Sequence, residues 1–236
     1  MIESSELQLS VVLPVQNQAD HIVEVIRTYI AALTPIVDSF ELVPVLNASS
    51  DASQSLIAEC FGDDDRVRTM TTDVAGWGNA VLLGITAARG AHVCYTNSSR
   101  TTGDELLQVV HAHNASLHTF TKAQRTARRP WYRAVGSWLY NLEAQILFGV
   151  SAGDINGTPK IATRETLASI PLTERGDFVD LELLYRCRQR GIPVKSVPMS
   201  ARARLGGRST TGLKTAISLL TGALVRRVTW SREVSM

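Results

Sequence analysis

Two carboxylates two positions apart, Asp180 and Glu182, are the residues of this sequence best suited to acid–base chemistry. They fall in an apolar stretch that predicts a helix, where residues two apart point in different directions. Only one of the two can therefore face a reacting group. We expect Asp180 to be the general base toward an acceptor hydroxyl or phosphate, with Glu182 as the second catalytic candidate.

A second set of polar residues follows apolar, β-branched runs that predict strands. These residues form four segments: Gln16–Gln18, Asn47–Asp51, Gly76–Asn79 and Asn97–Thr101. Strands that alternate with helices predict right-handed βαβ units and a mainly parallel sheet. Ligands of such sheets bind outside the carboxyl ends of the strands. We therefore expect the four segments to share one edge of an α/β domain with a Rossmann-like central sheet flanked by helices.

The expected strands cover residues 9–14, 41–46, 66–70, 92–96, 118–122, 160–163 and 194–197. Expected helices begin after Asn17 or Asp20 and near Leu56, and cover 76–90, 106–113, 131–148, 180–190 and 213–228. Pro44 argues against a simple central position for its strand, because proline cannot donate to a sheet ladder. Residues 123–133, rich in arginine, predict a basic loop. We expect a single domain, with 8–100 as a nucleotide-binding half, 101–210 as an acceptor half, and 211–236 as a C-terminal helix and tail.

Composition describes an ordinary globular protein of 236 residues, 44% hydrophobic and 19% charged. No apolar run is long enough for a membrane span, and the N-terminus does not resemble a signal peptide. Three widely spaced cysteines favour free thiols, so we expect a cytoplasmic protein. Residues 1–120 carry five Lys and Arg against fourteen Asp and Glu, a net charge of −9, whereas the remaining residues carry +11. The basic half is either a solvated face or a surface that meets phosphate.

The sequence lacks the motifs of several other kinds of functional site. His111 and His113 are two apart on an expected helix, whereas metal ligation favours a spacing of four. No serine lies in a G-x-S-x-G elbow, and the glycines at 76 and 78 are too few for a dinucleotide fingerprint. Arginines interleaved with aromatics at 125–133 are also seen in nucleic-acid loops. A loop facing phosphate or a membrane fits better, and we expect no nucleic-acid partner.

Six segments, taken in order, resemble family 2 glycosyltransferases of the GT-A fold, most of all the polyprenyl-phosphate sugar synthases. They are residues 11–18 (VVLPVQNQ), 41–53, the glycine helix from Gly76 to Gly90, 154–160 (DINGTPK), 178–184 (FVDLELL) and 204–209 (RLGGRS). The resemblance covers about residues 9–210. It implies transfer of a sugar from a nucleotide diphosphate-sugar to a lipid phosphate or another small acceptor.

The resemblance also implies the residues of the site. On the donor side these are Pro14, Gln16, Gln18, Asn47, Ser49, Gly78, Asn97, Ser99, Arg125, Arg204, Arg208 and Ser209, and on the acceptor side Asp154, Asn156 and Lys160. The family's metal-binding D-x-D falls on Asn97-Ser98-Ser99, and its paired aspartates on Leu46 and Asn47. Amides and hydroxyls hold Mg²⁺ or Mn²⁺ poorly, so we expect no bound metal and no other cofactor.

Two explanations of this degenerate D-x-D remain open. In a metal-free transferase, neutral donors and arginines would hold the diphosphate, whereas an inactive homologue would keep the fold as a binding or scaffolding protein. The C-terminal helix, with apolar residues at helical spacing, suits packing on the domain, a homodimer, or an anionic membrane surface. The sequence leaves these alternatives open.

Overall fold

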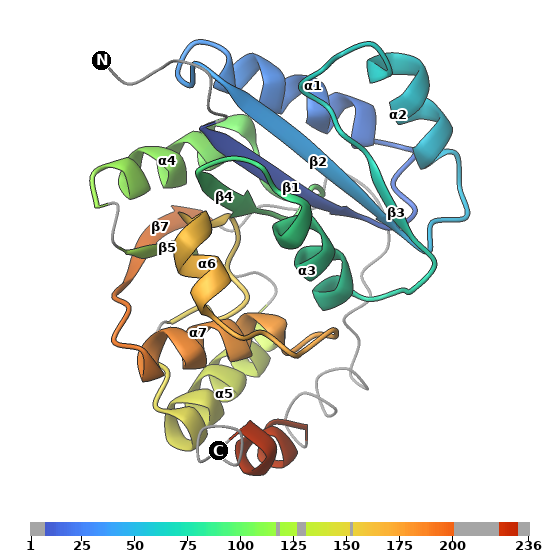
Figure 1. The fold of residues 1–236 in the computed structure, drawn as a ribbon. Helices are drawn as coiled ribbons and strands as arrows, with labels where there is room; N and C mark the ends of the chain where they lie inside the picture. The colour runs from blue at the N-terminus through green and yellow to red at the C-terminus, as the bar shows by residue number, and fades with distance from the viewer. Residues whose placement is uncertain (1–7, 117–118, 127–130, 152, 201–221, 231–236) are drawn as a thin grey trace.

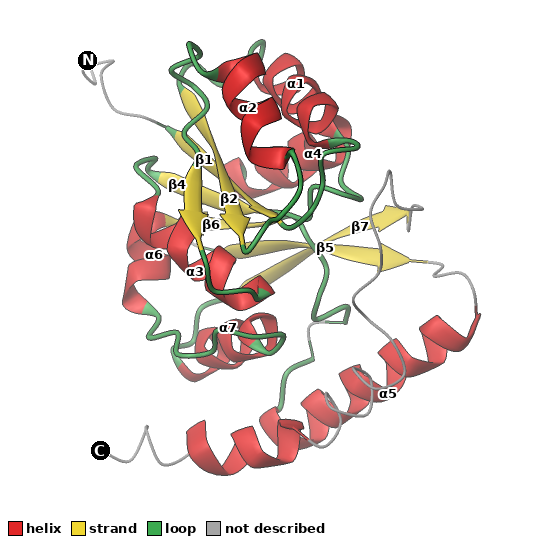
Figure 2. Cartoon of the chain, turned by 90° about the vertical axis from the view of Figure 1, so that its right-hand side faces the viewer, coloured by secondary structure: helices red, strands yellow, loops and turns green. Residues whose placement is uncertain are grey.

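The structure, a computed structural model, describes residues 8–116, 119–126, 131–151, 153–200 and 222–230. One seven-stranded sheet runs through it in the order β3-β2-β1-β4-β6-β5-β7, with helices on both faces (Figures 1 and 2). In chain order the elements are β1 (Leu9–Val15), α1 (Ile22–Leu33), β2 (Phe40–Asn47), α2 (Ser53–Phe61), β3 (Met70–Thr72), α3 (Trp77–Ala87), β4 (His92–Tyr95), α4 (Gly103–Asn114), β5 (Phe120–Thr126), α5 (Trp131–Phe148), β6 (Lys160–Thr163), α6 (Arg164–Ser169), α7 (Val179–Gln189) and β7 (Val194–Ser200).

The sheet is mainly parallel, as the alternation of strands and helices predicts. Strand β1 pairs in parallel with β2 and β4, and β2 pairs in parallel with β3. Strand β6 runs the other way between β4 and β5, while β5 and β7 are parallel. Because β6 is reversed, its first residue, Lys160, lies beside Tyr95, the last residue of β4. Residues from both halves of the chain therefore meet at one edge.

The side chains on the two faces of β1 belong to two separate hydrophobic cores. Leu9, Val11 and Leu13 pack with apolar residues of α1, α2 and α4, whereas Val12 packs with residues of α3, α5 and α7. Successive side chains of a strand point to opposite faces, so an unbroken apolar run is what a strand covered on both sides requires. The three-layer arrangement follows directly.

Pro44 lies in β2, which is an interior strand of this sheet. On the β1 side Pro44 is opposite Leu13, and on the other side β3 reaches only Val45 to Asn47. A further isolated bridge joins Leu42 to Val67. Pro44 thus falls between the two contacts of β2 on that side, where its missing N–H interrupts no pairing with β3.

Three local expectations are wrong. Helix α1 begins after His21 without a side-chain cap, because Asp20 contacts the His21 ring and Asn17 has a positive φ of 52°. Arg125 lies within strand β5 rather than in a loop, since β5 continues to Thr126. Helix α6 was not expected. It begins after Thr163, whose hydroxyl accepts a hydrogen bond from the Thr166 N–H.

The C-terminal helix is described for residues 222–230, where it packs on the domain. Trp230 is buried, stacks on the Tyr185 ring with centroids 5.8 Å apart, and lies 5.3 Å from Phe148. Arg226 pairs with Glu174 and lies over the Phe178 ring. Within the described part of the chain, no helix is both long enough and apolar enough to cross a membrane.

At the edge opposite the carboxyl ends of the parallel strands, Glu41 joins β1 and β2 to the segments that precede β3 and β4. Its side chain is 0% exposed and accepts hydrogen bonds from Ser10 Oγ at 2.6 Å, Arg68 Nε at 3.0 Å and the Arg89 backbone N–H at 2.9 Å. Ser10 Oγ in turn accepts from the Gly90 N–H at 2.8 Å. Burial alone would raise the pKa of Glu41, but these hydrogen bonds from Arg68, Ser10 and Arg89 lower it overall.

Replacing Glu41 by Gln should therefore lower the free energy of unfolding by about 1.5–3 kcal/mol at pH 7, since hydrogen bonds to a buried carboxylate are lost. A depressed folded pKa stabilises the protein above the unfolded pKa, and this contribution disappears as the pH falls through the folded pKa. Urea unfolding of both proteins at pH 7 and pH 4 should show the difference shrinking at pH 4. The exposed Glu59→Gln is the control; an equal cost in that variant would contradict a role for this network.

Candidate active site at the carboxyl edge of the sheet

The four polar segments expected at one edge do lie there. Strands β1, β2, β3 and β4 are parallel neighbours, so the segments that follow them emerge on the same side. Strand β5 runs in the same direction, and its C-terminal residues approach the loop that precedes β6. The candidate site therefore combines the ends of β1, β2, β4 and β5 with the beginnings of α3, β6 and α7.

The turn Asn97-Ser98-Ser99 after β4 is held by its own side chains. The Asn97 carboxamide oxygen accepts the Ser99 N–H at 3.0 Å, and Ser98 Oγ donates to the Gln18 carboxamide oxygen. Ser98 Oγ also lies 3.4 Å from the Pro14 carbonyl oxygen. Ser98 and Ser99 are buried and Asn97 is partly exposed. Of the three, Asn97 is the side chain best placed to meet a ligand.

Asn47 and Ser49 tie the end of β2 to the end of β1. Asn47 Nδ2 donates to the Val15 carbonyl oxygen at 3.0 Å, and its Oδ1 accepts the Gly76 N–H at 3.3 Å. Ser49 Oγ contacts the same carbonyl oxygen at 3.2 Å and accepts the Asn17 N–H. Asn47 is buried, so its amide fixes the geometry of the edge. Gln16 is exposed beside it.

Gly78 lies in the first turn of α3, where the backbone of residues 175–176 passes very close. A Cβ at Gly78 would be 2.5 Å from the Gly176 carbonyl oxygen. The Asn79 N–H donates to the Arg175 carbonyl oxygen at 2.7 Å, and Arg175 Nη1 lies 3.3 Å from Asn79 Oδ1. This glycine is needed for close packing between α3 and the loop before α7.

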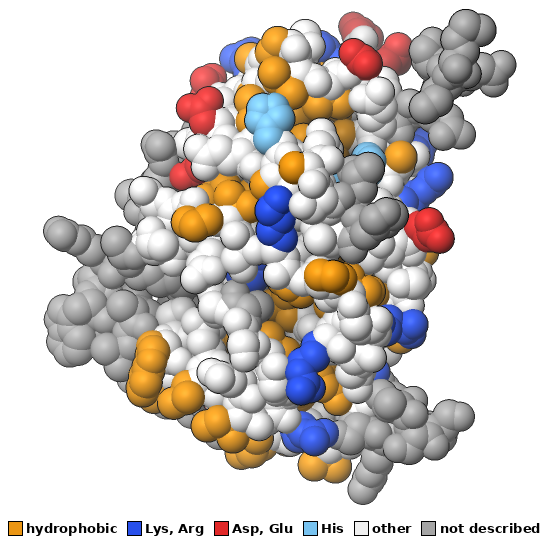
Figure 3. All heavy atoms as spheres, turned by 90° about the vertical axis from the view of Figure 1, so that its left-hand side faces the viewer, with side chains coloured by type: hydrophobic (Ala, Val, Ile, Leu, Met, Phe, Trp, Pro, Cys, Tyr) orange, Lys and Arg blue, Asp and Glu red, His pale blue; other side chains and the backbone are white. Residues whose placement is uncertain are grey.

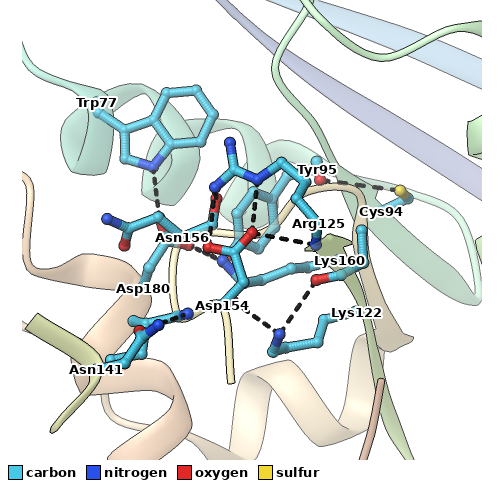
Figure 4. Close-up of polar contacts among 12 residues, drawn as sticks. Trp77, Cys94, Tyr95, Lys122, Arg125, Asn141, Asp154, Asn156, Lys160 and Asp180 are labelled. Atoms are coloured by element: carbon cyan, nitrogen blue, oxygen red, sulfur yellow. Dashed lines mark hydrogen bonds and ion pairs between the residues drawn. The ribbon is translucent and has the colours of Figure 1, made fainter. Parts of the chain in front are cut away.

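Asp180, in the first turn of α7, is the centre of a buried polar cluster (Figure 4). Its carboxylate is 3% exposed and accepts hydrogen bonds from the Tyr95 hydroxyl at 2.7 Å and the Trp77 indole N–H at 3.1 Å. It also forms an ion pair with Lys160, which has no solvent exposure. Burial lowers the pKa of Lys160, while the adjacent Asp180 carboxylate acts to raise it.

A second ion pair lies beside the first. Arg125 donates two hydrogen bonds to the Asp154 carboxylate, from Nε to Oδ2 at 2.6 Å and from Nη2 to Oδ1 at 3.0 Å (Figure 4). Its Nη2 also donates to the Asn156 carbonyl oxygen at 2.7 Å. The Asn156 side-chain oxygen is buried without a partner among the described residues. Arg125 and Asp154 thus fix the loop before β6, and Asn156 has acceptor capacity left.

Lys122 is buried between these pairs, next to Lys160 across the β5–β6 ladder. Its ammonium donates to the backbone oxygens of Asp154 at 2.8 Å and Ala123 at 3.1 Å. Burial and the neighbouring Lys160 charge lower the pKa of Lys122 to about 7. Sequence reasoning missed Lys122, Trp77 and Tyr95. Nothing in the linear sequence shows that α3, β4 and β5 bring these three side chains together.

Glu182 is directed away from this cluster. Its carboxylate accepts the N–H groups of Thr173 and Glu174 at 2.9 and 2.8 Å and the Thr173 hydroxyl at 2.9 Å, and it pairs with Arg186. These contacts hold the loop that packs on α3. Of the two carboxylates, Asp180 is the one that faces the candidate site. Arg204, Arg208 and Ser209, also expected in the site, lie outside the described residues.

The residues at this edge are poorly suited to a divalent metal. Within the described residues, no group of three or more His, Cys, Asp or Glu side chains is arranged to hold one. The turn after β4 offers an amide and two hydroxyls, and Asp154 and Asp180 are each paired with a cation. Mg²⁺ and Mn²⁺ prefer anionic oxygens, so the described donor set does not fit the ion.

Comparison with known proteins gives consistent matches. Residues 10–115 match the model of the glycosyl transferase family 2. Glycosyltransferase AglD of Haloferax volcanii is 26% identical over 204 residues, which is 82% of this chain and 33% of that protein. An undecaprenyl-phosphate 4-deoxy-4-formamido-L-arabinose transferase of Edwardsiella ictaluri is 25% identical over 217 residues, 90% of this chain and 65% of that protein. The chain thus spans one third to two thirds of these relatives.

Among solved structures, glucosyl-3-phosphoglycerate synthase from Mycobacterium tuberculosis, bound to Mn²⁺, UDP and glucosyl-3-phosphoglycerate, superposes with a TM-score of 0.71. It is 22% identical, and the match covers 94% of this chain and 80% of that one. A complex of the same enzyme with Mn²⁺ and UDP-glucose also matches. The resemblance predicted from the six sequence segments is confirmed: residues 10–115 match glycosyltransferase family 2, both relatives are sugar transferases, and the chain has the GT-A fold.

Proposed function

We propose that the protein transfers a sugar from a nucleotide diphosphate-sugar to a lipid phosphate or another small acceptor. The observation that carries this proposal is the meeting of the polar strand ends with Asp180 at one edge of a family 2 domain. The names of two relatives, one acting on undecaprenyl phosphate and one on a phosphoglycerate, favour a phosphorylated acceptor. The basic second half of the chain fits such an acceptor.

In this reaction an acceptor oxygen forms a bond to the anomeric carbon of the donor sugar. The bond from that carbon to the diphosphate breaks, and the nucleoside diphosphate leaves with the electron pair. A hydroxyl acceptor must also lose a proton, whereas an ionised phosphate already carries its negative charge. The protein therefore has to hold two anionic reactants close together and stabilise the charge that develops on the leaving diphosphate.

We assign the proton-accepting or acceptor-orienting role to Asp180. It is the carboxylate at the meeting point of α3, β4 and α7, and it pairs with the buried Lys160 side chain. On the acceptor side, Asp154, Asn156 and Lys160 are joined by short polar contacts to Arg125 and Asp180. Glu182 acts instead by fixing the loop at residues 173–174.

We further propose that donor binding does not depend on a metal. Solved relatives of this fold include complexes with Mn²⁺ and UDP, so metal use does occur among them. In this chain the turn after β4 carries no carboxylate, and a neutral turn avoids repulsion of the diphosphate. Asn97, on the donor side, is placed to donate to a phosphate or ribose oxygen, and arginines supply the positive charge.

Metal dependence is tested directly by calorimetry. Nucleoside diphosphates titrated into the protein should bind with affinities that change less than threefold between 1 mM EDTA and 1 mM Mn²⁺, an order-of-magnitude expectation for a site without anionic metal ligands. Trials with the uridine, guanosine, cytidine and adenosine diphosphates identify the base. A tenfold or greater loss of affinity in EDTA would show that another set of ligands holds a metal.

Introducing carboxylates into the turn after β4 distinguishes the two explanations of its neutral residues. In a metal-free transferase, Asn97→Asp with Ser99→Asp should weaken donor binding, since two unit charges about 5 Å apart repel by roughly 3 kcal/mol at an effective dielectric of 20. In a decayed metal enzyme the same change should create Mn²⁺-dependent binding. The control is Gln108→Glu with Gln189→Glu, which adds the same charge on exposed helix positions. A double variant that binds like the wild type under both conditions would exclude donor binding at this edge.

Loss of the Asp180 carboxylate should mainly affect the transfer rate, and loss of the Glu182 carboxylate should mainly affect the free energy of unfolding. Asp180→Asn should reduce the transfer rate by about 10²–10⁴-fold if it handles the acceptor proton. Glu182→Gln should mainly lower the free energy of unfolding, by about 1–3 kcal/mol, because it leaves loop donors poorly satisfied. Rates and urea unfolding are measured on both variants, since Asp180→Asn also leaves Lys160 unpaired. A larger rate loss in Glu182→Gln would reverse the assignment.

A further inference from the structure

Lysine is rare in this chain, and two of its lysines lie side by side in the candidate site. Of the 24 Lys and Arg residues only four are lysines, at positions 122, 160, 195 and 214. Lys122 and Lys160 are register partners on β5 and β6, and both side chains are fully buried. An arginine keeps its charge in a protein, whereas a buried lysine can lose its proton. The candidate site therefore contains two cationic side chains whose charge can change.

Lys122 differs from Lys160 because it has no carboxylate partner. Lys160 pairs with Asp180, whereas Lys122 forms no ion pair with any residue that the structure describes. Its ammonium donates to two backbone oxygens, those of Asp154 at 2.8 Å and Ala123 at 3.1 Å (Figure 4). A buried cation without a counter-ion is costly, so an apolar side chain of similar length would serve the fold at a lower cost.

The ammonium of Lys122 binds the turn that carries the acceptor-side residues. The Asp154 carbonyl oxygen also accepts the Gly157 N–H at 3.0 Å, which closes a tight turn. Gly157 lies directly against β5, since a Cβ there would be 2.1 Å from the Ala123 carbonyl oxygen. Asn156, whose side-chain oxygen is buried without a partner among the described residues, belongs to this turn. Lys122 thus ties the turn to β5 and helps to fix the position of Asn156.

Lys122 sets the net charge of the cluster that it forms with the two neighbouring acid–base pairs. Arg125 pairs with Asp154, and Lys160 pairs with Asp180. Each pair sums to zero, wherever its shared proton lies. The cluster of these five side chains is therefore cationic when Lys122 is protonated and neutral when it is not.

The charge of Lys122 changes near neutral pH. Burial and the adjacent Lys160 charge lower the pKa of Lys122 to about 7, and Arg125 acts in the same direction. The carboxylates of the two pairs act to raise this pKa. On β7 the register partner of Lys122 is Ser196, which is uncharged. An anion bound beside the cluster would favour the protonated lysine, and the protonated lysine would favour the anion equally, since linkage between two sites is reciprocal.

Arg125 offers an anion access to this cluster. Its side chain is 21% exposed, and its Nη1 makes no hydrogen bond to the described residues. Figure 3 shows Asp and Glu side chains only in the upper half of the face that it draws, whereas Lys and Arg side chains also lie in the lower half. This agrees with the excess of Lys and Arg after residue 120 and favours an anionic ligand.

We infer that Lys122 is a positioning residue that carries a proton when the acceptor side holds an anion. It acts through the turn that it binds and through its charge, and it does not contact the ligand. The acceptor group that suits this arrangement is a phosphate or a similar anion, because a neutral acceptor would gain nothing from the charge. This inference deepens the proposed function and rests on it only for naming the acceptor. Anion binding should be tighter below the pKa of Lys122 than above it.

Sulfate is the probe, because it is a phosphate-like dianion with no proton to lose between pH 6 and pH 8.5. The protein is labelled with ¹³C-lysine, and its four lysine resonances are followed by NMR. The Lys122 resonance should titrate near pH 7, and at higher pH when sulfate is present. Sulfate binding is followed through the Lys160 resonance at constant ionic strength. It should be about tenfold tighter at pH 6 than at pH 8.5, the order of magnitude for charges several ångströms apart at an effective dielectric of 20.

Two substitutions remove the charge of Lys122. Lys122→Met has a similar length and no donor, whereas Lys122→Gln keeps a donor for the turn. In both variants the sulfate affinity should differ by less than about twofold between pH 6 and pH 8.5. The matched control is Lys195→Met, which removes a partly buried lysine of β7 that donates to the Ala112 carbonyl oxygen outside the site. This control should keep the tenfold difference, and circular dichroism confirms that each variant is folded.

Three results would overturn the inference. These are equal sulfate affinity of the wild type at the two pH values, a pH dependence that persists in both Lys122 variants, or sulfate that leaves the Lys160 resonance unmoved. If neither variant folds, the wild type decides, since a Lys122 titration that sulfate does not change would exclude the linkage. A protein that shows the linkage but transfers no sugar would count only against the proposed function.

Discussion

The ion pair between Lys160 and Asp180 is the interaction on which the candidate site depends. Both side chains are removed from solvent, and the carboxylate also accepts from Tyr95 and Trp77. The four residues come from β6, α7, β4 and α3, so one carboxylate holds together elements from both halves of the chain. Loss of one partner of such a pair typically costs about 3–5 kcal/mol, because the remaining charge stays buried. The reversed direction of β6 is what brings Lys160 to the end of β4.

Around this pair the edge is organised by polar groups that bind the backbone. Asn47 joins β1 to the beginning of α3, Ser98 joins the turn after β4 to Gln18, and Arg125 with Asp154 holds the loop before β6. Such fixed side chains lose little further freedom when a ligand binds, which is how a site is preorganised. The same contacts engage the carboxylates of Asp154 and Asp180 with the cations of Arg125 and Lys160.

A continuous set of contacts connects this edge with the C-terminal end of the described chain. Glu182 holds residues 173–174, the next two residues pack on Gly78, and Glu174 pairs with Arg226 of the helix at 222–230. The loop before α7 therefore contacts both the beginning of α3, at the candidate site, and the helix at 222–230.

Much of this could be predicted from the sequence, because the relevant signals are local. Apolar runs and helical spacing predicted α5 and β6 with their observed bounds, the parallel arrangement of β1 to β4, and the common edge of the polar segments. Ordered motifs predicted the family. The sequence also placed Asp180 and Glu182 on different sides of α7, since a spacing of two on a helix requires it.

Tertiary structure alone decided which of those two carboxylates faces the site, because that depends on what packs on each side of α7. It also decided that Lys122, Lys160 and Tyr95 lie side by side on three strands, since strand order and direction set the register and local pattern does not. The sequence also could not show that one apolar side of α5 is exposed, since a hydrophobic stripe has the same pattern whether or not another element covers it. The residues of the chain determined the elements and their chemistry, and long-range packing determined which side chains meet.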